Sequence, residues 1–352
     1  MQIIINAGGQ GTRLWPVSTK ELPKQFCKIL GENSLLENTV IRLLKDFANE
    51  QIWININENH REYFDKSLPD FKNVLTEPER RDTFAAVISH AAVVAHKSGR
   101  DEPIIFLNSD HHIAPDSSVN LHNLAFLEIA KTLQNQDFDL IVCGIVPTWP
   151  SSQYGYIEIN PEDSKTCSEK PAKVLSFKEK PDTETAEKYL ATKNYLWNFG
   201  SFAFTFNSLI KILEKVQPES AKIVEQIYQK GKIELEDFSQ LPKTSFDYAV
   251  LEVADNLGIM GMQLEIWDDI GGFDTLYKYL PEVLDIETES YKQANHIQVA
   301  GLGNKIQTYL PGKKVAFVGV SGLIVVETPE GLIICDPKKA SNVKKVSQYF
   351  EE

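Results

Sequence analysis

Short apolar runs alternate with stretches of helical periodicity over residues 1–150. The runs fit buried strands at residues 3–5, 51–56, 103–107 and 139–144. Apolar residues recur at helical spacing over residues 35–47, 83–96 and 121–133. Asn33 or Ser34 is placed to cap the first of these helices. Strands separated by helices of this length connect through right-handed crossovers, so we predict an α/β fold with a Rossmann-like, doubly wound, mostly parallel sheet.

The pattern changes further along the chain. Between residues 151 and 285, strands and helices are mixed, and no linker rich in Gly, Pro or Ser separates them. We expect strands at 156–159, 174–178, 201–206 and 263–267, and helices at 183–189, 208–214 and 221–228. After about residue 290, short apolar segments at 315–320, 323–327 and 331–335 are separated by turn residues. We therefore predict a large α/β domain over residues 1–285 and a small β-rich, β-helix-like domain over residues 286–352, closed by a helix from about Ser341.

The composition is that of a globular protein with an excess of acidic residues. The 352 residues are 42% hydrophobic, which supplies a sizeable core, and their formal net charge is −13. This charge argues against a nucleic-acid partner, whose phosphates need a basic stripe, but a few local cations can still hold small anions. No apolar run reaches the roughly 20 residues that span a bilayer, and the N-terminal segment lacks the pattern of a signal peptide. We expect a cytoplasmic protein without a membrane partner.

A glycine-rich loop with nearby cations follows the first predicted strand. Residues 7–26 read AGGQGTRLWPVSTKELPKQF. The glycines allow main-chain N–H groups to approach phosphate oxygens closely, and Arg13 and Lys24 supply positive charge. The segment lacks the Gly-Lys-Ser/Thr ending of a Walker loop and the glycine spacing of a dinucleotide fingerprint. A phosphate-binding loop is therefore favoured over a tight turn with incidental cations.

Charged residues stand at the ends of several predicted strands. Asp110 follows the strand at 103–107 and could hold Mg²⁺, although an aspartate at such a place is more often a helix cap or a turn former. Asp269 follows an apolar segment and could be a second ligand, with Asp268 as a competitor. Glu179 and Lys180 would bind sugar hydroxyls and a phosphate, or form a solvated charged run.

The glycine-rich loop and a series of further segments, spread over almost the whole chain, resemble the sugar-nucleotide pyrophosphorylase family. The loop looks like the signature of that family, and its PKQF ending is similar to the mannose-1-phosphate guanylyltransferase branch. The resemblance continues in order through NSDHHI at 108–113, YGYIEI at 154–159, FKEKPD at 177–182, WNFGSFAF at 197–204, FDYAVLE at 246–252 and WDDIGGFDTLY at 267–277. The segment AFVGVSGLIVVETPEGLIICD at 316–336 also looks like the β-rich end of that branch.

The resemblance implies a nucleotidyltransferase fold and a Mg²⁺-dependent enzyme that transfers GMP from GTP to α-D-mannose 1-phosphate. It implies catalytic roles for Arg13 and Lys24. The nucleotide would be bound by Ala7, Gly8, Gly9, Gly11, Thr12, Arg13, Lys24, Glu77, Asp82 and Ser109. The sugar phosphate would be bound by Asp110, Gly155, Glu179, Lys180, Asn198 and Gly200. The metal ligands would be Asp110 and Asp269.

Two segments depart from the family pattern. Thr19, followed by Lys20, stands where the family usually has an arginine, and a lysine does not reproduce the fork of the guanidinium. Asp82 replaces an asparagine near the nucleobase, where a carboxylate is compatible with the N–H donors of guanine. The same chemistry with another nucleotide or a heptose or glucose 1-phosphate, and a non-catalytic sugar-nucleotide sensor, therefore remain alternatives. The apolar residues between Val315 and Val325 would pack on the first domain or join two chains as a homodimer.

Overall fold

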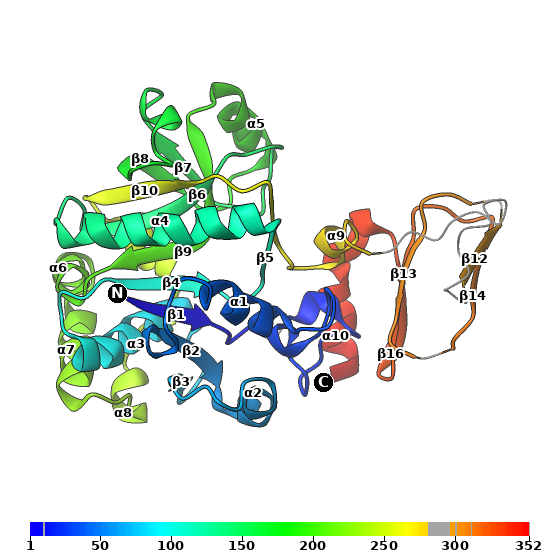
Figure 1. Cartoon of the computed structure of the whole chain (residues 1–352), viewed down its shortest axis with the longest axis horizontal. Coiled ribbons are helices and arrows are strands. Elements are labelled where there is room, and N and C mark those ends of the chain that lie inside the picture. Colours follow the sequence, from blue (N-terminus) through cyan, green and yellow to red (C-terminus); the bar gives the residue numbers. More distant parts are fainter. Residues whose placement is uncertain (10, 281–295, 300, 311, 352) are drawn as a thin grey trace.

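A computed structural model describes residues 1–9, 11–280, 296–299, 301–310 and 312–351. In this part of the chain, nine strands form one sheet in the order β3-β2-β1-β4-β9-β6-β10-β8-β7 (Figure 1). Their bounds are β1 (Gln2–Asn6), β2 (Ile52–Asn57), β3 (Val74–Glu77), β4 (Ile104–Asn108), β6 (Leu140–Ile145), β7 (Tyr156–Ile159), β8 (Ala172–Lys178), β9 (Tyr195–Phe204) and β10 (Leu257–Met262). Strands β3, β2, β1 and β4 are parallel, as are β6 and β10, whereas β9 and β8 run antiparallel to their neighbours. The predicted α/β fold with a doubly wound, mostly parallel sheet is confirmed.

Helices cover both faces of this sheet. One face packs against α1 (Leu35–Leu43), α2 (Arg61–Ser67) and α4 (Asp116–Gln134), and the other against α3 (Asp82–Ser98), α6 (Phe206–Val216) and α7 (Pro218–Lys230). The sheet separates two large apolar clusters of the core, one on each face. Side chains alternate along β1, so Ile3 and Ile5 lie in one cluster and Ile4 lies in the other. Two shorter helices, α5 (Thr183–Thr192) and α8 (Leu235–Phe238), are also present.

Local signals explain several element boundaries. Ser34, one of the two expected caps, accepts a hydrogen bond from the main-chain N–H of Glu37, whose side chain accepts one in return from the N–H of Ser34. Thr205 caps α6 through Ser208, so the strand predicted at 201–206 ends instead at Phe204 and begins earlier, at Tyr195.

The strand predicted at 263–267 is wrong. The structure has β10 at Leu257–Met262 and a short strand, β11 (Ile266–Asp269), which pairs antiparallel with β5 (His111–Ala114). Gly258 and Gly261 make β10 hard to recognise in the sequence, because glycine is unfavourable within strands. Both glycines are nevertheless required, because a Cβ on Gly258 would collide with Phe138 and a Cβ on Gly261 with Cys167. The difference between the predicted and the observed strand matters for the site, because β11 carries Asp269.

The C-terminal part consists of short strands and one helix. Strand β12 (His296–Val299) pairs in parallel with β14 (Val315–Val318), and β13 (Lys305–Thr308) pairs in parallel with β15 (Ile324–Thr328). Strand β16 (Gly331–Cys335) closes the second sheet antiparallel to β15. The chain then forms helix α10 (Val343–Glu351). The boundary predicted at residues 285 and 286 lies outside the described residues.

Part of this C-terminal region packs directly on the larger part of the chain. Ile324 and Val326 share an apolar cluster with Leu14 and Val17 of the glycine-rich loop, and with the short helix α9 (Phe273–Leu276). Figure 1 shows α9 and α10 between the large sheet and the C-terminal strands. The alternating apolar residues of the C-terminal strands are thus partly buried within this chain.

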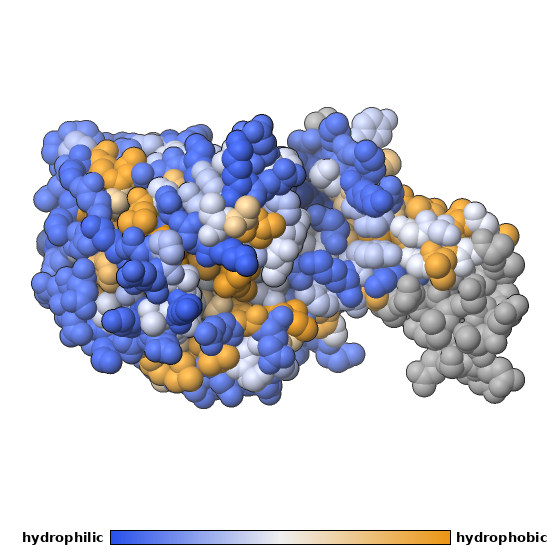
Figure 2. All heavy atoms as spheres, turned by 90° about the horizontal axis from the view of Figure 1, so that it is seen from above, coloured by the Kyte–Doolittle hydropathy of each residue, from blue (hydrophilic) through white to orange (hydrophobic). Residues whose placement is uncertain are grey.

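The outer surface agrees with the composition. Viewed as in Figure 2, it is mostly hydrophilic, with apolar residues gathered in a few patches. No helix within the described ranges has the length and the apolar character needed to cross a bilayer.

Candidate active site

The glycine-rich loop leaves the carboxyl end of β1 and turns back sharply. Gly11 has a φ of 69°, in the left-handed region, and a Cβ at this position would collide with the Cβ of Lys24. Ser18 Oγ donates to the carbonyl of Gly11 at 2.5 Å, and Gln25 Nε2 donates to the carbonyl of Ala7 at 2.5 Å. These contacts fold the loop compactly, so Lys24 lies against the glycines although it is distant from them in sequence.

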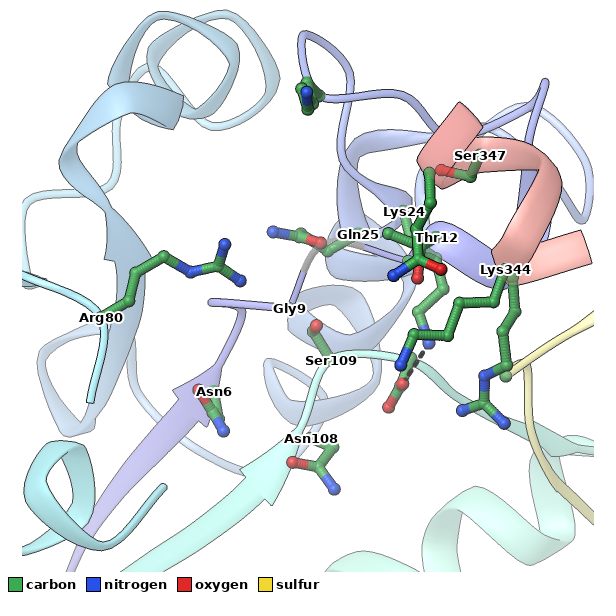
Figure 3. A pocket seen from close by; sticks show the side chains of 16 residues that line it. Asn6, Gly9, Thr12, Lys24, Gln25, Arg80, Asn108, Ser109, Lys344 and Ser347 are labelled. Carbon is green, nitrogen blue, oxygen red and sulfur yellow. Dashed lines mark hydrogen bonds and ion pairs between the residues drawn. The ribbon is translucent and has the colours of Figure 1, made fainter. Parts of the chain in front are cut away.

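A cavity of about 600 Å³ opens over this loop. Basic side chains from separate parts of the chain line it, namely Arg13, Lys20, Lys24, Arg80 and Lys344. Asp110 is the single acidic residue among the described residues of the lining. Figure 3 shows Arg80 on one side and Lys24 and Lys344 on the other, with Gly9 and Ser109 between them. Such a concentration of positive charge in a protein of net charge −13 indicates an anionic ligand.

Lys24 and Asp110 form an ion pair inside the cavity. The distance from Lys24 Nζ to Asp110 Oδ2 is 2.5 Å, and the two side chains are 11% and 25% exposed. Burial opposes ionisation of Asp110, but the positive charge of Lys24 and its hydrogen bond outweigh burial and hold the pKa of the carboxyl below its usual value. Asp110 does not cap a helix, because the next helix, α4, begins at Asp116. It is an ionised carboxylate that lines the cation-rich cavity.

Asp269 lies near this pair. Strand β11 places Asp269 opposite His111 on β5, and Tyr154 Oη donates to Asp269 Oδ1 at 2.7 Å. Burial raises the pKa of Asp269 to about 6, the hydrogen bond from Tyr154 lowers it, and the Asp110 carboxylate raises it. Two neighbouring carboxylates that disfavour each other's charge are suited to a hard cation.

Asp268, the competing carboxylate, is already paired on the other side of the strand. It accepts hydrogen bonds from Lys278 Nζ at 2.7 Å and from Tyr279 Oη. Successive residues of a strand point to opposite faces, so Asp268 and Asp269 do not serve one ion together. The structure therefore favours Asp269 as the partner of Asp110.

A smaller cavity of about 190 Å³ continues from the first. The two cavities share Asn6, Gly9 and Arg80. Gly8, Glu77 and Asp82 contribute to the smaller one, where Glu77 Oε1 accepts a hydrogen bond from Asn55 Nδ2 at 2.9 Å. Burial raises the pKa of Glu77, and Asp82 stands at the start of α3 with a φ of 66°. The carboxylate acceptors of Glu77 and Asp82 thus line a small pocket beside the larger cavity.

A third group of predicted residues meets where β7, β8 and β9 approach one another. Asn198 N donates to the carbonyl of Gly155 at 2.8 Å, and a Cβ on Gly155 would collide with Glu179 Oε2. Lys180 Nζ donates to Glu179 Oε1 at 2.5 Å. The other carboxylate oxygen, Oε2, is buried without a hydrogen-bond partner among the described residues. A buried acceptor without a donor suits a hydroxyl group of a ligand.

Asp247 belongs to this group although the sequence did not single it out. Asn198 Nδ2 donates to Asp247 Oδ1 at 3.0 Å. Burial raises the pKa of Asp247 to about 6, and the nearby Glu179 carboxylate raises it too. Glu179, Asp247 and Asn198 therefore present three oxygen-bearing side chains at one place.

Gly200 connects the two regions. It has a φ of 79°, and its N–H donates to Asn198 Oδ1 at 3.0 Å. A Cβ on Gly200 would lie 3.0 Å from Asn108 Nδ2, and Asn108 lines the larger cavity. The acceptor cluster and the cationic cavity are therefore neighbours at one edge of the sheet.

The sequence analysis did not predict three of the basic residues that line the cavity to be binding residues. Lys20 stands out in the sequence only as a departure in the loop, although its position there is a usable signal. Arg80 stands between Glu77 and Asp82, two predicted nucleotide-binding residues, which is also a signal. Lys344 comes from α10, and no local pattern connects that helix with the loop.

Comparisons with known proteins agree with this geometry. Residues 2–286 match the family described as Nucleotidyl transferase, and residues 294–348 match the MannoseP isomerase/GMP-like beta-helix domain. The xanthan biosynthesis protein XanB of Xanthomonas campestris pv. campestris (strain B100) is 33% identical over 97% of this chain and 72% of its own length. A mannose-1-phosphate guanylyltransferase of Klebsiella pneumoniae is 31% identical over 99% of this chain and 74% of its own length.

Solved structures share the fold. The crystal structure of a mannose-1-phosphate geranyltransferase from Thermus thermophilus matches with a TM-score of 0.82 and 27% identity, over 100% of this chain and 99% of that one. A mannose-6-phosphate isomerase from Helicobacter pylori matches with a TM-score of 0.60 over 76% of this chain and 99% of that one; at 22% identity this concerns the fold alone. The family resemblance and the fold with a β-helix-like C-terminal domain are thus confirmed. The chain belongs to the nucleotidyl transferase family of enzymes.

Proposed function

We propose that this enzyme transfers GMP from GTP to α-D-mannose 1-phosphate, giving GDP-mannose and pyrophosphate. The observation that supports this most directly is the position of a cation-rich cavity next to a cluster of buried hydrogen-bond acceptors. The first suits a triphosphate, and the second suits a sugar. Relatives at 31% and 30% identity that are named mannose-1-phosphate guanylyltransferase, from Klebsiella pneumoniae and Salmonella muenchen, support this choice of substrates.

The reaction joins two anions, so it depends on alignment and charge neutralisation. A phosphate oxygen of the sugar 1-phosphate attacks the α-phosphorus of GTP. The bond from that phosphorus to the bridging oxygen breaks, and pyrophosphate leaves with the electron pair. The attacking oxygen is already ionised, so the reaction needs no general base.

Each group of residues has a separate task in this proposal. Arg13 and Lys24 would bind the triphosphate, together with the main chain of the glycine-rich loop from Ala7 to Thr12 and with Ser109. Glu77 and Asp82, in the smaller cavity, would accept the N–H donors of guanine.

The sugar 1-phosphate would bind across the neighbouring cluster. Lys180 would hold its phosphate, and the free Oε2 of Glu179 would accept a sugar hydroxyl, as would Asn198. Gly155 and Gly200 leave room for the ring, because a side chain at either would meet Glu179 or Asn108.

Asp110 and Asp269 would hold Mg²⁺. When bound, the ion neutralises charge on the α-phosphate and on the departing pyrophosphate. The two residues fit it, because they are neighbouring oxygen donors and Asp268 is occupied elsewhere. No group of three metal-ligating side chains occurs in the described part of the chain, so phosphate oxygens and waters would complete the coordination.

A pyrophosphate-release assay over a matrix of nucleoside triphosphates and sugar 1-phosphates tests the proposal. We expect GTP with mannose 1-phosphate to give the fastest release, and only with Mg²⁺ present. A faster reaction with another pair, including a heptose or glucose 1-phosphate, would replace the substrate assignment. No release from any pair, combined with tight binding of GDP-mannose, would favour a non-catalytic sensor.

We also propose that the enzyme works in the cytoplasm and that two chains pair through the C-terminal domain. Val318, Leu332 and Ile334 of that domain are 67%, 53% and 62% exposed in the single chain, so apolar surface is left for such a contact. Sedimentation of the enzyme and of a Leu332→Asp variant checks the pairing. A dimer that persists in the variant, or a monomer throughout, contradicts it.

A further inference from the structure

Helix α10 lies against the glycine-rich loop, although the two are at opposite ends of the chain. The Phe350 ring stacks on Trp15 with a centroid distance of 5.1 Å and an interplanar angle of 19°. Val343 is 3% exposed and lies in the same apolar cluster as Leu14. Thr328 Oγ1 also donates to the main-chain carbonyl of Pro16 at 3.2 Å. Side chains at both ends of α10 therefore fix the position of the helix on the loop.

One face of α10 is turned toward the cationic cavity. Lys344, Ser347 and Gln348 line the cavity, and residues three and four positions apart share one face of a helix. Figure 3 shows Lys344 reaching from this helix into the cavity, on the same side as Thr12 and Lys24. Lys24 is paired with Asp110, whereas Lys344 has no ion pair with any carboxylate that the structure describes.

The position of Lys344 within the cavity indicates which part of a nucleotide it would meet. The smaller cavity, with Glu77 and Asp82, joins the larger one beside Arg80 and Gly9. Lys344 lies on the side opposite Arg80 (Figure 3). A triphosphate whose base occupies the smaller cavity would extend across the glycines toward α10.

We propose that Lys344 binds the terminal phosphates of the nucleoside triphosphate, and hence the departing pyrophosphate, so that the C-terminal helix completes the nucleotide site. This inference rests on the proposed function, since it takes the cationic cavity as the triphosphate site. Lys344 adds a further positive charge to those of Arg13 and Lys24 where negative charge is highest. The C-terminal domain is then part of the nucleotide site as well as a structural neighbour of the loop.

The test compares two adjacent lysines of the same helix. Lys344→Ala and Lys345→Ala remove the same charge from exposed positions, but only Lys344 lines the cavity. Calorimetry without Mg²⁺ or sugar measures binding of GTP, GMP and inorganic tripolyphosphate without turnover. We expect Lys344→Ala to weaken GTP and tripolyphosphate about tenfold or more, as for loss of a charged hydrogen bond, and to leave GMP unchanged. Lys345→Ala should leave all three ligands within about twofold of the parent, because that side chain is outside the cavity.

Three results would overturn the inference. The first is unchanged GTP and tripolyphosphate binding in Lys344→Ala. The second is equal weakening of GTP and GMP, which would mean that the loop has moved rather than that a phosphate contact is lost. The third is equal weakening by Lys345→Ala, which would mean a long-range charge effect. Lys344→Arg should keep most of the affinity, and thermal unfolding of each variant shows whether the fold is intact.

Failure of the proposed function is read from a different measurement. The parent enzyme is tested for pyrophosphate release from GTP and mannose 1-phosphate, which does not involve any variant. Tripolyphosphate contains neither base nor sugar, so its binding reports on Lys344 whatever the substrates are. In steady-state kinetics, Lys344→Ala should raise the KM for GTP and leave the KM for the sugar 1-phosphate unchanged.

Discussion

Replacing Asp247 by asparagine should stabilise the enzyme at pH 8 and weaken its binding of the sugar phosphate. The carboxyl group accepts a hydrogen bond from Asn198 Nδ2 at 3.0 Å and lies near Glu179. Burial is the main reason that its pKa is raised to about 6, and repulsion from Glu179 adds to it. At neutral pH, Asp247 is therefore ionised in surroundings that oppose its charge. Asparagine has nearly the same shape and carries no charge.

The size of the effect follows from the raised pKa. Between the ordinary value of 3.8 and about 6, the folded protein keeps a proton that the unfolded chain has released. The contribution of this group to stability is therefore highest at low pH and is lost as the pH rises through this window. A shift from 3.8 to about 6 corresponds to about 3 kcal/mol, of which roughly half is lost between pH 5 and pH 8.

Urea unfolding of the parent and of Asp247→Asn at pH 5 and pH 8 measures this difference. The stability of the variant relative to the parent should be about 1.5 kcal/mol more favourable at pH 8 than at pH 5. Asp70→Asn, which removes an exposed carboxylate, controls for the change in net charge. A relative stability that is the same at both pH values would refute the reasoning. In the same variant, the KM for mannose 1-phosphate should rise about tenfold if the ionised carboxylate accepts a sugar hydroxyl.

Three further predictions concern the phosphate-binding region. Gly11→Ala should lower the melting temperature and the rate of pyrophosphate release, since φ is 69° and the new Cβ would collide with Lys24; Gly9→Ala, whose Cβ meets open space, should melt like the parent. Lys24→Ala and Asp110→Ala should each lose at least about 100-fold in turnover with the fold retained, and near-normal rates in either would contradict the site assignment. Asp269→Asn should raise the Mg²⁺ concentration for half-maximal rate about tenfold in a metal titration, and an unchanged requirement would remove Asp269 from the metal site.

Much of the sheet could be predicted because its central strands are continuous apolar runs. Ile3, Ile4 and Ile5 of β1 are fully buried, and the buried run of β4 ends just before Asp110. Since parallel strands end at the same edge, the loop after β1 and the aspartate after β4 are expected near each other. The ion pair of Lys24 with Asp110 joins them. Here local pattern and topology together determine the geometry.

The rest of the site depends on contacts that no local pattern encodes. Strand β10 contains two glycines, so its sequence resembles a loop. They are required only because Phe138 and Cys167, which are distant in sequence, pack too closely to leave room for a Cβ. Asp247 begins a π-helical turn, and its importance comes only from its distance to Asn198 and Glu179. Lys344 reaches the cavity because α10 packs on Trp15, a contact between residues at the two ends of the chain.

The charges of the candidate site are poorly satisfied without ligands, and this bears on how it works. Asp269 and Asp247 both have a pKa raised to about 6, and Glu179 Oε2 is buried without a partner among the described residues. When ionised, Asp269 and Asp247 therefore oppose folding in the free enzyme. Both carboxylates, and Glu179 Oε2, would gain a partner from a metal ion or a sugar hydroxyl. Ligand binding then supplies interactions that the protein itself lacks. The enzyme would also discriminate between sugar phosphates, because a ligand without the matching hydroxyl leaves a buried acceptor unpaired. These groups lie at the edge of a sheet that has extensive apolar clusters on both faces. Burial of those clusters stabilises the fold and offsets the cost of holding the groups in place.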